Sequence, residues 1–404
     1  MKKIYSLIEK SFFSRPKLVL TVLIVIVALA HGVYAQFIGL KSSCPDCSWY
    51  ASYADQLIAD NFELGSLLSY SGAIPIYFYL TWISTLALIK LIFGPAWQSG
   101  ILYFHIFVNL LIIATAVLTV YRASQASLIA AIATGLLLFV AIEHVLWIPF
   151  LLSDISYEAI SLCCLIFLYY ALTSVSIRLK LGFGVVTFFF MLVALFSRPT
   201  SVALVMAVLC SCILIVKINF DNPEDRLCRL RTITVALVSI VLVGMFLHAL
   251  LLTQKTSADV TGFLSQLISF YSEGVVVTDR PETFVTPPED FLEYFFISLR
   301  KLIYFFWISL DAFSIVHSVG NWIFFFPAYL GCALILKDLF SLHPRLGQNE
   351  QVLALICIIF LVSMAVFHSV IMLDYDWRYR LPCIPVFAII FGLGVRLIAT
   401  RRAG

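Results

Sequence analysis

Three acidic residues are candidates for chemistry because they stand alone in a long apolar stretch. Between residues 73 and 220 the only Asp or Glu residues are Glu143, Asp154 and Glu158. An ionised group at membrane depth costs about 2.5 to 3.5 kcal/mol, so such groups usually have a function. Asp154 and Glu158 are four positions apart, and on a helix both carboxylates lie on one face. The pair could bind substrate or accept a proton, or Asp154 could only cap the following helix. His144 is a candidate for substrate binding, or a hydrogen-bonded structural residue at a helix end.

A fourth acid, Asp46, precedes an amphipathic segment. From Ser48 to Asp60, apolar residues recur at positions 50, 53, 54, 57 and 58, whereas positions 52, 55, 56 and 60 are polar. This spacing predicts a helix that lies along the membrane surface. Ser48 is a plausible N-cap, which would leave Asp46 just before the positive end of the helix. The Asp46 carboxylate is thus a candidate catalytic group, and Tyr50 and Tyr53 are candidate substrate contacts. The alternative is an ordinary solvated acid beside a surface helix.

Two segments supply arginines that could bind a phosphate. Ser197-Arg198-Pro199-Thr200 separates two apolar runs, and Arg378-Tyr379-Arg380-Leu381-Pro382 precedes the last one. A planar guanidinium binds phosphate through two parallel hydrogen bonds, and aromatic neighbours help to position it. The candidates for contact with an anionic substrate are Arg198, Arg378, Tyr379 and Arg380. Alternatively, Arg198 extends to lipid headgroups and the later segment is an aromatic and basic anchor at the membrane surface.

These residues must be positioned by a chain that is mostly buried in lipid. Of its 404 residues, 62% are hydrophobic and 12% are charged, and this charged share is about half that of a globular protein. The composition predicts an all-α, polytopic transmembrane bundle of about 10 to 12 helices, formed by residues 1–404 as a single domain. It excludes a soluble enzyme, a disordered chain, a disulfide-rich scaffold and a coiled coil. The basic residues do not form one dense cluster of the kind that binds nucleic acid, so the sequence does not indicate nucleic-acid binding. The apolar runs cover residues 18–36, 73–95, 101–120, 126–142, 155–175, 182–197, 199–217, 232–253, 294–315, 320–340, 352–373 and 382–399.

The distribution of basic residues predicts which helix ends face the cytoplasm. Basic clusters lie within residues 2–17, 178–180, 226–231 and 396–402, and such clusters favour the cytoplasmic side. The first segment resembles a signal peptide, but its apolar run is long enough to be a retained helix. Two larger outer loops are then expected at residues 37–72 and 254–293. The runs at 73–95 and 101–120 cannot both cross the membrane in this arrangement, so one should be re-entrant or interfacial.

The cysteines fall into two groups. Most of them lie in apolar runs, where a thiol behaves as a small hydrophobic group. Cys44 and Cys47 lie in the polar outer segment and could form a short-loop disulfide or stay free. Redox catalysis is not favoured because a thioredoxin-like βαβ context is missing. A zinc site would need two further ligands, and none is nearby.

The predicted topology brings the acids and the arginines to the outer face. There a carboxylate could take the proton from an attacking hydroxyl as a general base, while guanidinium groups neutralise charge on a departing phosphate. These groups suit the attack of an acceptor on a sugar that is carried by a lipid phosphate, with the apolar helices holding a polyprenyl tail. The chemistry requires Asp46, Asp154 and Arg378 to meet in one cavity at headgroup level.

The order of these elements resembles that in the GT-C superfamily of membrane glycosyltransferases. An acid early in the first outer loop, before an aromatic-rich helix, is similar to Pro45-Asp46-Cys47 and the residues that follow. A second acidic site resembles Ser153-Asp154-Ile155-Ser156-Tyr157-Glu158. An Arg-Pro hairpin and a late Arg-Tyr-x-x-Pro element resemble the segments at 197–200 and 378–382. The likeness covers most of the chain, although each motif is short.

The resemblance implies an inverting transfer from a polyprenyl-phosphate sugar donor to a lipid, glycan or protein acceptor. It implies that Asp46 is the base, that Asp154 and Glu158 orient substrate or metal, and that the arginines bind phosphate. The expected location is the bacterial inner membrane, with the site facing the periplasm. The chain departs from some members because it lacks a large soluble C-terminal domain. Cys47 also replaces a second acid, which makes a divalent metal at Asp46 doubtful; a metal is not required by the sequence, although Asp154 and Glu158 could supply oxygen ligands.

Two other classes of function remain open. A flippase or transporter could use Asp154 and Glu158 as a proton relay, but the acids lie near the predicted outer ends of helices and no paired repeat is visible. A lipid-linked glycan polymerase or ligase would also use outward Arg and His residues. The donor separates these enzymes, because a polymerase consumes a diphosphate-linked oligosaccharide.

Overall fold

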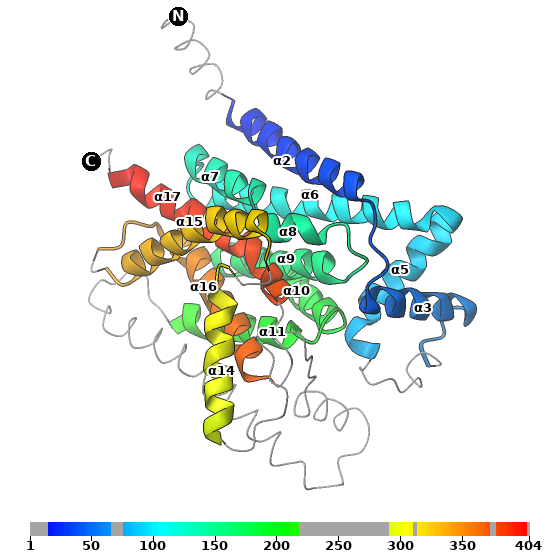
Figure 1. Ribbon diagram of the computed structural model, residues 1–404. Coiled ribbons are helices and arrows are strands. Elements are labelled where there is room, and N and C mark those ends of the chain that lie inside the picture. Colours follow the sequence, from blue (N-terminus) through cyan, green and yellow to red (C-terminus); the bar gives the residue numbers. More distant parts are fainter. Residues whose placement is uncertain are drawn as a thin grey trace, which may run out of the picture.

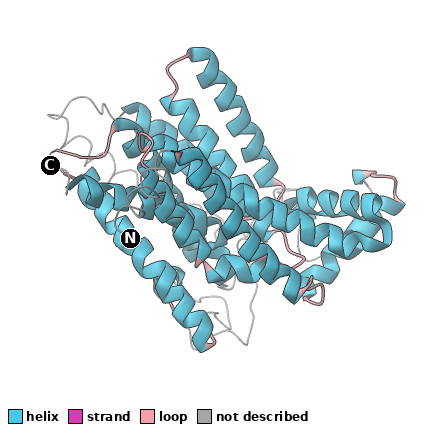
Figure 2. Ribbon diagram, turned by 90° about the horizontal axis from the view of Figure 1, so that it is seen from above, coloured by secondary structure: helices cyan, strands magenta, loops and turns pink. Residues whose placement is uncertain are grey.

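The computed structural model describes residues 15–65, 76–217, 291–309, 313–341, 343–371 and 377–401. Over these residues the chain consists of helices joined by loops, and an isolated bridge joins Lys41 to Phe150 (Figure 2). The all-α prediction is confirmed. The predicted run at 232–253 lies outside the described residues, as does nearly all of the predicted outer loop at 254–293.

Among the described residues, seven helical segments are long and apolar enough to cross a membrane. This confirms the prediction of a polytopic bundle. The long helices are α2 (Pro16–Ile38), α6 (Trp97–Ala123), α9 (Asp154–Thr173), α10 (Ile177–Leu195), α15 (Ile315–Leu339), α16 (Gln348–Val370) and α17 (Ile384–Arg401). Shorter apolar helices include α7 (Leu128–Phe139), α11 (Ser201–Lys217) and α14 (Phe291–Phe306).

Helix α16 lies in the core of the bundle, and nearly all of its residues are buried. Helix α17 packs against both α7 and α15 (Figure 1). The backbones of α15 and α17 approach closely, because a Cβ atom at Gly331 would lie 2.8 Å from the Cα atom of Phe391. Small residues permit such close packing between membrane helices. A larger side chain at position 331 would push the two helices apart.

One end of the bundle is covered by short helices. Helices α3 (Pro45–Ala59) and α5 (Leu80–Phe93) pack together at the right-hand end of Figure 1. The 3₁₀ helices η1 (Ile76–Tyr79) and η2 (Gly94–Ala96) flank α5. Helix α5 has 14 residues and is therefore about 21 Å long, which is less than the roughly 30 Å hydrocarbon core of a bilayer. Helix α6 is long enough to cross, so α5 is the better candidate for the element of the 73–120 region that does not; the expectation that one of the two does not cross stays a prediction.

Helix α3 has the predicted periodicity but differs from the prediction in two ways. Tyr50, Tyr53 and Leu57 are buried on one face, as the pattern indicated. This face packs against Trp82 and Ile83 of α5, rather than on lipid, because α5 offers an apolar partner within the protein.

The second difference concerns the helix start. The N-cap is Cys44 and not Ser48, since the helix begins at Pro45 and the Cys44 sulfur accepts a hydrogen bond from the Cys47 backbone N–H. Proline is favoured at the first position of a helix because its missing N–H would be unpaired there anyway. Asp46 therefore lies in the first turn of α3 and not before it, still at the positive end of the helix.

Four other segments reach the same end of the bundle as α3. They are the chain after α8 (Ile142–Trp147), the first turn of α9, the turn between α10 and α11, and the 3₁₀ helix η5 (Trp377–Cys383). The bridge from Lys41 to Phe150 ties the chain after α8 to the chain after α2. A backbone hydrogen bond from Thr81 to Phe196 ties α5 to the turn that follows α10. These segments carry the acids and arginines that the sequence singled out.

Candidate active site

Two ion pairs lie at this end of the bundle. The Arg378 Nη1 atom lies 3.1 Å from Asp46 Oδ2, and Arg198 Nη1 contacts Asp154 Oδ1. The Asp46 side chain is 41% exposed and that of Arg378 is 17% exposed, whereas Arg198 and Asp154 are nearly fully buried. The four residues come from α3, η5, the α10–α11 turn and the start of α9.

Two tyrosines connect the pairs into one site. The Tyr79 phenol lies within electrostatic range of Asp46, Asp154, Arg198 and Arg378. Tyr50 lies 5.3 Å from Tyr79 between ring centroids, and it is within range of Asp46 and Arg198. The structure thus places Asp46, Asp154 and Arg378 near the same tyrosine at one end of the bundle; a shared cavity at headgroup level stays a prediction. Burial, reinforced by Tyr79, raises the pKa of Tyr50 well above its ordinary value of 10, so Tyr50 remains a hydrogen-bond donor.

The position of Asp46 is fixed by the start of α3. Cys44 and Cys47 form a disulfide, which closes a loop around Asp46; the sequence alone left this bond open. Helix α3 is also tied to α5, because Lys90 Nζ lies 2.7 Å from Asp55 Oδ1 and 2.9 Å from the Ala51 carbonyl oxygen. These restraints hold the Asp46 carboxylate beside Arg378.

The position of Arg378 is supported by aromatic contacts within and beside η5. Its guanidinium carbon lies 5.7 Å from the centroid of the Tyr379 ring. Tyr379 stacks on His368 of α16, with 4.7 Å between centroids and 3° between the ring planes. Trp377, on the other side of Arg378, contacts Trp147 and His317. Tyr379, a candidate substrate contact from the sequence, is therefore packed against the core helix.

Glu158 and Asp154 lie on α9 as expected, but their carboxylates have different partners. Glu158 pairs with His144, whose Nδ1 atom lies 2.9 Å from both carboxylate oxygens. The His144 Nε2 atom lies 2.7 Å from Asn109 Oδ1, which in turn lies 3.4 Å from His31 Nδ1. His144 and Glu158 are fully buried. They form a polar network inside the bundle, beneath the pair formed by Asp154.

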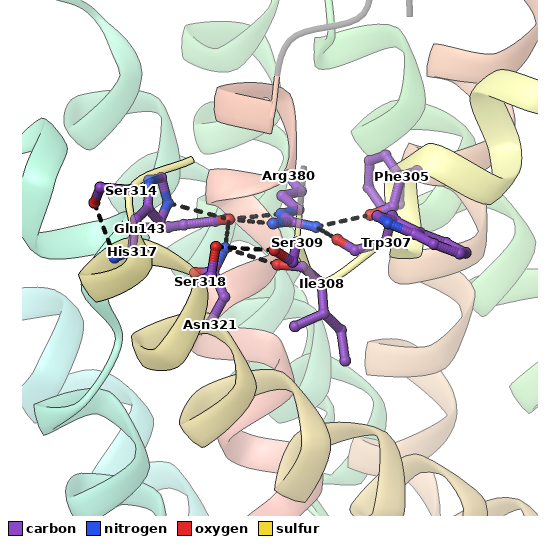
Figure 3. Close-up of polar contacts among 10 residues, drawn as sticks. All are labelled: Glu143, Phe305, Trp307, Ile308, Ser309, Ser314, His317, Ser318, Asn321 and Arg380. Atoms are coloured by element: carbon purple, nitrogen blue, oxygen red, sulfur yellow. Dashed lines mark hydrogen bonds and ion pairs between the residues drawn. The ribbon is translucent and has the colours of Figure 1, made fainter. Parts of the chain in front are cut away.

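Arg380 forms a separate, buried ion pair with Glu143 (Figure 3). Its Nε atom lies 2.7 Å from Glu143 Oε2, its Nη2 atom contacts Oε1, and its Nη1 atom contacts the Trp307 carbonyl oxygen. Asn321 Nδ2 lies 2.9 Å from Glu143 Oε1. Burial opposes ionisation of Glu143, but Arg380 and His317 outweigh it and lower the pKa of this carboxyl below its ordinary value.

Sequence reasoning missed several polar residues near the site. His105 and Asn109 of α6 are both buried, and they share one helix face because they are four positions apart. Polar residues at this spacing inside an apolar run were a signal that could have been used. Tyr79 carried no signal of its own, because it is one of many aromatic residues in the chain. The pairing of Glu143 with Arg380 joins residues 237 positions apart, which no local pattern indicates.

A divalent metal has no evident set of ligands in the described part of the chain. No group of three or more His, Cys, Asp or Glu side chains there could hold a metal ion. Asp154 and Glu158, which the sequence suggested as oxygen ligands, face Arg198 and His144 instead.

A solved structure resembles the chain over almost its whole length. The similarity to the crystal structure of ArnT from Cupriavidus metallidurans bound to undecaprenyl phosphate covers 95% of this chain and 63% of that one, with a TM-score of 0.55 and 17% sequence identity. The chain shares its fold with ArnT. The resemblance expected from the sequence is confirmed for the fold. The chain spans less than two thirds of the length of ArnT.

Sequence comparison does not assign the chain to a family, since no family model and no curated protein sequence matches it. The similarity to ArnT is therefore a similarity of architecture. What the site can do must be argued from its own residues.

Proposed function

We propose that this protein is a membrane glycosyltransferase that moves a sugar from a polyprenyl-phosphate donor to a lipid, glycan or protein acceptor. One observation carries the proposal: a partly exposed pair, Asp46 and Arg378, lies beside a buried pair, Asp154 and Arg198, at one end of an apolar helical bundle. A carboxylate that can reach water and two guanidinium groups are the parts that transfer from a lipid phosphate requires. The fold shared with ArnT, which was crystallised with undecaprenyl phosphate, supports the same class of donor.

Asp46 is the general base in this proposal. Its carboxylate takes the proton from the acceptor hydroxyl while the hydroxyl oxygen forms the new bond to the anomeric carbon. The bond from that carbon to the phosphate oxygen breaks, and the lipid phosphate leaves with the bonding electrons. Attack from the face opposite the phosphate inverts the configuration.

Arg378 binds the departing phosphate and also positions the base. Its guanidinium contacts Asp46 at 3.1 Å and presents further N–H donors in a planar fork. A phosphate bound there would lie close to Asp46, so base and leaving group would be held on one guanidinium. The same contact restrains Asp46 before substrate arrives.

Arg198 is the second phosphate ligand. Asp154 holds one side of its guanidinium, while its buried Nε atom has no hydrogen-bond partner among the described residues. A buried donor without a partner costs about 1 to 3 kcal/mol, and a charged donor costs more. An anionic ligand would remove this cost. In this proposal Asp154 positions Arg198, and Tyr50 and Tyr53 line the approach to Asp46.

Glu158, His144 and Arg380 have structural roles in this proposal. The Glu158–His144 network supports the start of α9, and Arg380 joins η5 to α8 through Glu143. Neither Arg380 nor His144 is proposed as a direct substrate contact, because their polar atoms already contact other groups of the protein. His144 contacts Glu158 and Asn109, and Arg380 contacts Glu143 and the Trp307 carbonyl oxygen. We place the enzyme in the bacterial inner membrane with the site facing the periplasm, as the basic residues favour.

The proposal can be tested with purified protein in lipid nanodiscs and an undecaprenyl-phosphate donor that carries a labelled sugar. We expect label to enter a lipid, glycan or protein from a membrane extract in a new glycosidic bond, and not with the Asp46→Asn variant. Movement of intact donor between leaflets without a new bond would indicate a flippase. Transfer only from a diphosphate-linked oligosaccharide would indicate a polymerase or ligase. Either result would overturn the proposal.

A further inference from the structure

A small cavity opens beside the proposed active site, between α5, α6 and α9. Its volume is about 130 Å³. Two of its lining residues, Ser153 and Ser197, directly precede Asp154 and Arg198 in the chain, so the cavity adjoins the buried ion pair. The apolar part of its lining is formed by Phe104, Val108, Ala159 and Ile160.

Other residues of the lining carry buried polar atoms that have no hydrogen-bond partner in the part of the chain that the structure describes. Trp82 is 2% exposed and Ser153 is 1% exposed. Among the described residues, Trp82 Nε1, Ser153 Oγ and Ser156 Oγ have no hydrogen-bond partner. Leaving a buried polar group unpaired costs about 1 to 3 kcal/mol, and all three of these groups belong to residues that line this one cavity. Their grouping favours a ligand with its own polar groups over a hydrocarbon chain.

Three further hydroxyl groups line the cavity and can accept hydrogen bonds. Thr85 donates to the Thr81 carbonyl at 2.7 Å, and Thr81 and Ser197 donate to the Val193 carbonyl at 3.2 and 2.6 Å. A hydroxyl oxygen that donates its proton still has lone pairs. The cavity thus offers an indole N–H donor, two free hydroxyls and three hydroxyl acceptors.

The chemistry of the wall defines the class of ligand. The lining residues include no charged side chain, so a phosphate or carboxylate is disfavoured inside the cavity. A lining that combines hydrogen-bonding residues with apolar ones suits a ring with several hydroxyl groups and apolar C–H bonds, which describes a sugar. The volume corresponds to about four water molecules, which allows the hydroxyl face of one ring to enter but not an oligosaccharide.

We propose that this cavity binds the sugar ring of the lipid-phosphate donor, and that Trp82, Ser153 and Ser156 select that sugar. The assignment rests on the proposed function, because it places the phosphate at Arg198 and Arg378. Arg198 lies next to Ser197 in the wall, and it lies within electrostatic range of Arg378. A phosphate held by these arginines would bring the sugar esterified to it to the mouth of the cavity.

The test compares two kinds of lipid on the full-length protein in nanodiscs. One is bare undecaprenyl phosphate, and the other is undecaprenyl phosphate esterified to mannose, to glucose or to an aminopentose. Dissociation constants are measured for the wild type and for Trp82→Phe and Ser156→Ala. Trp82→Phe removes the indole N–H and keeps an aromatic ring against His105, on which Trp82 stacks at 5.3 Å. Ser363→Ala is the matched control, because Ser363 of α16 is also buried and unpartnered among the described residues but does not line the cavity.

We expect each cavity variant to bind the best sugar-bearing lipid roughly two- to ten-fold more weakly, as for the loss of one neutral hydrogen bond. Binding of bare undecaprenyl phosphate should not change, and Ser363→Ala should bind both lipids like the wild type. Unchanged binding of both lipids by the cavity variants would overturn the proposal, and so would an equal loss for both. The proposed function fails in a different way: wild-type protein would then not bind undecaprenyl phosphate at all, with or without a sugar.

Discussion

Arg378 and Arg380 are two residues apart on η5, yet they lie in contrasting environments. Arg378 pairs with the partly exposed Asp46 on α3. Arg380 is 1% exposed and pairs with the equally buried Glu143 on α8 (Figure 3). A 3₁₀ helix has three residues per turn, so residues two apart point in different directions. One short helix therefore presents one arginine to the site and directs the other into the protein.

The contrast shows how a similar ion pair can serve two purposes. Two hydrogen bonds from Arg380 hold Glu143, and Asn321 and the Trp307 carbonyl occupy further positions around the pair. Such a pair is rigid and has little capacity for a ligand. Asp46 keeps 41% of its side chain exposed, so it can exchange its partner for a substrate. We infer that the Arg380 pair fixes η5 and thereby positions the Arg378 pair.

The largest effect should follow from neutralising the acid of the exposed pair. Asp46→Asn keeps the size of the side chain but removes the base, and positioned acid–base groups typically contribute about 10²- to 10⁴-fold to a rate. We expect transfer to fall by that factor, while expression, membrane insertion and the melting temperature stay as in the wild type. Initial rates with labelled donor and melting curves in detergent measure both effects. Retained activity in this variant would remove Asp46 from the mechanism.

Changes to the buried pair, Glu143 and Arg380, should instead lower the stability of the protein. Removing one partner of a buried ion pair leaves an uncompensated charge and costs about 3 to 5 kcal/mol. We expect Glu143→Ala and Arg380→Ala each to lower the melting temperature and the yield of folded protein strongly. Replacing both residues, as in Glu143→Leu with Arg380→Met, should recover much of this loss, because it leaves no charge unpaired.

Activity in that double variant would sharpen the comparison. If Arg380 acts only by positioning η5, the folded Glu143→Leu, Arg380→Met double variant should retain measurable transfer with an unchanged donor KM. A stable double variant that no longer binds the donor would instead assign Arg380 to the phosphate site.

Arg378→Ala should have a smaller effect, which falls mainly on the donor. A hydrogen bond to a charged group contributes about 1.5 to 3 kcal/mol, or roughly 10- to 150-fold in affinity. We expect the donor KM to rise within that range and the acceptor KM to change little. Arg378→Lys is the matched variant: it keeps the charge but loses the fork that binds phosphate at two points, so it should fall between wild type and alanine. Equal effects on both substrates would argue against a phosphate role for Arg378.

Much of the architecture could be predicted from local patterns in the sequence. Apolar runs indicated the long helices because a membrane span needs a continuous apolar surface. The periodicity around Tyr50 predicted α3. The charge pattern predicted that one element of the 73–120 region does not cross the membrane, and the short length of α5 agrees with that prediction. The start of α3 was mispredicted because Ser48 is a common N-cap residue, although Pro45 was the better signal.

The partners within the site could not be predicted from the same patterns. Arg378 and Arg380 have the same side chain and both adjoin Tyr379 in sequence, and what distinguishes their roles is the packing of α3 and α8. Glu158 shares a helix face with Asp154, but its carboxylate pairs with His144 and not with the arginine that binds Asp154. These pairings depend on contacts between distant helices, and a single sequence does not contain a pattern for them.

The smallest expected effect is a pH dependence confined to the buried pair. Because the folded protein holds the pKa of Glu143 below the ordinary value of 4.5, its ionised form stabilises the fold above that pH, and this contribution is lost as the pH falls toward the lower value. Glu143→Gln has no such charge, so the difference in melting temperature between wild type and Glu143→Gln should be constant from neutral pH to about 5 and shrink below 4.5. Taking this difference removes contributions from other carboxyl groups. A difference that stays constant to pH 3, or that grows on acidification, would contradict a charged Glu143–Arg380 pair and with it the distinction between the two arginines.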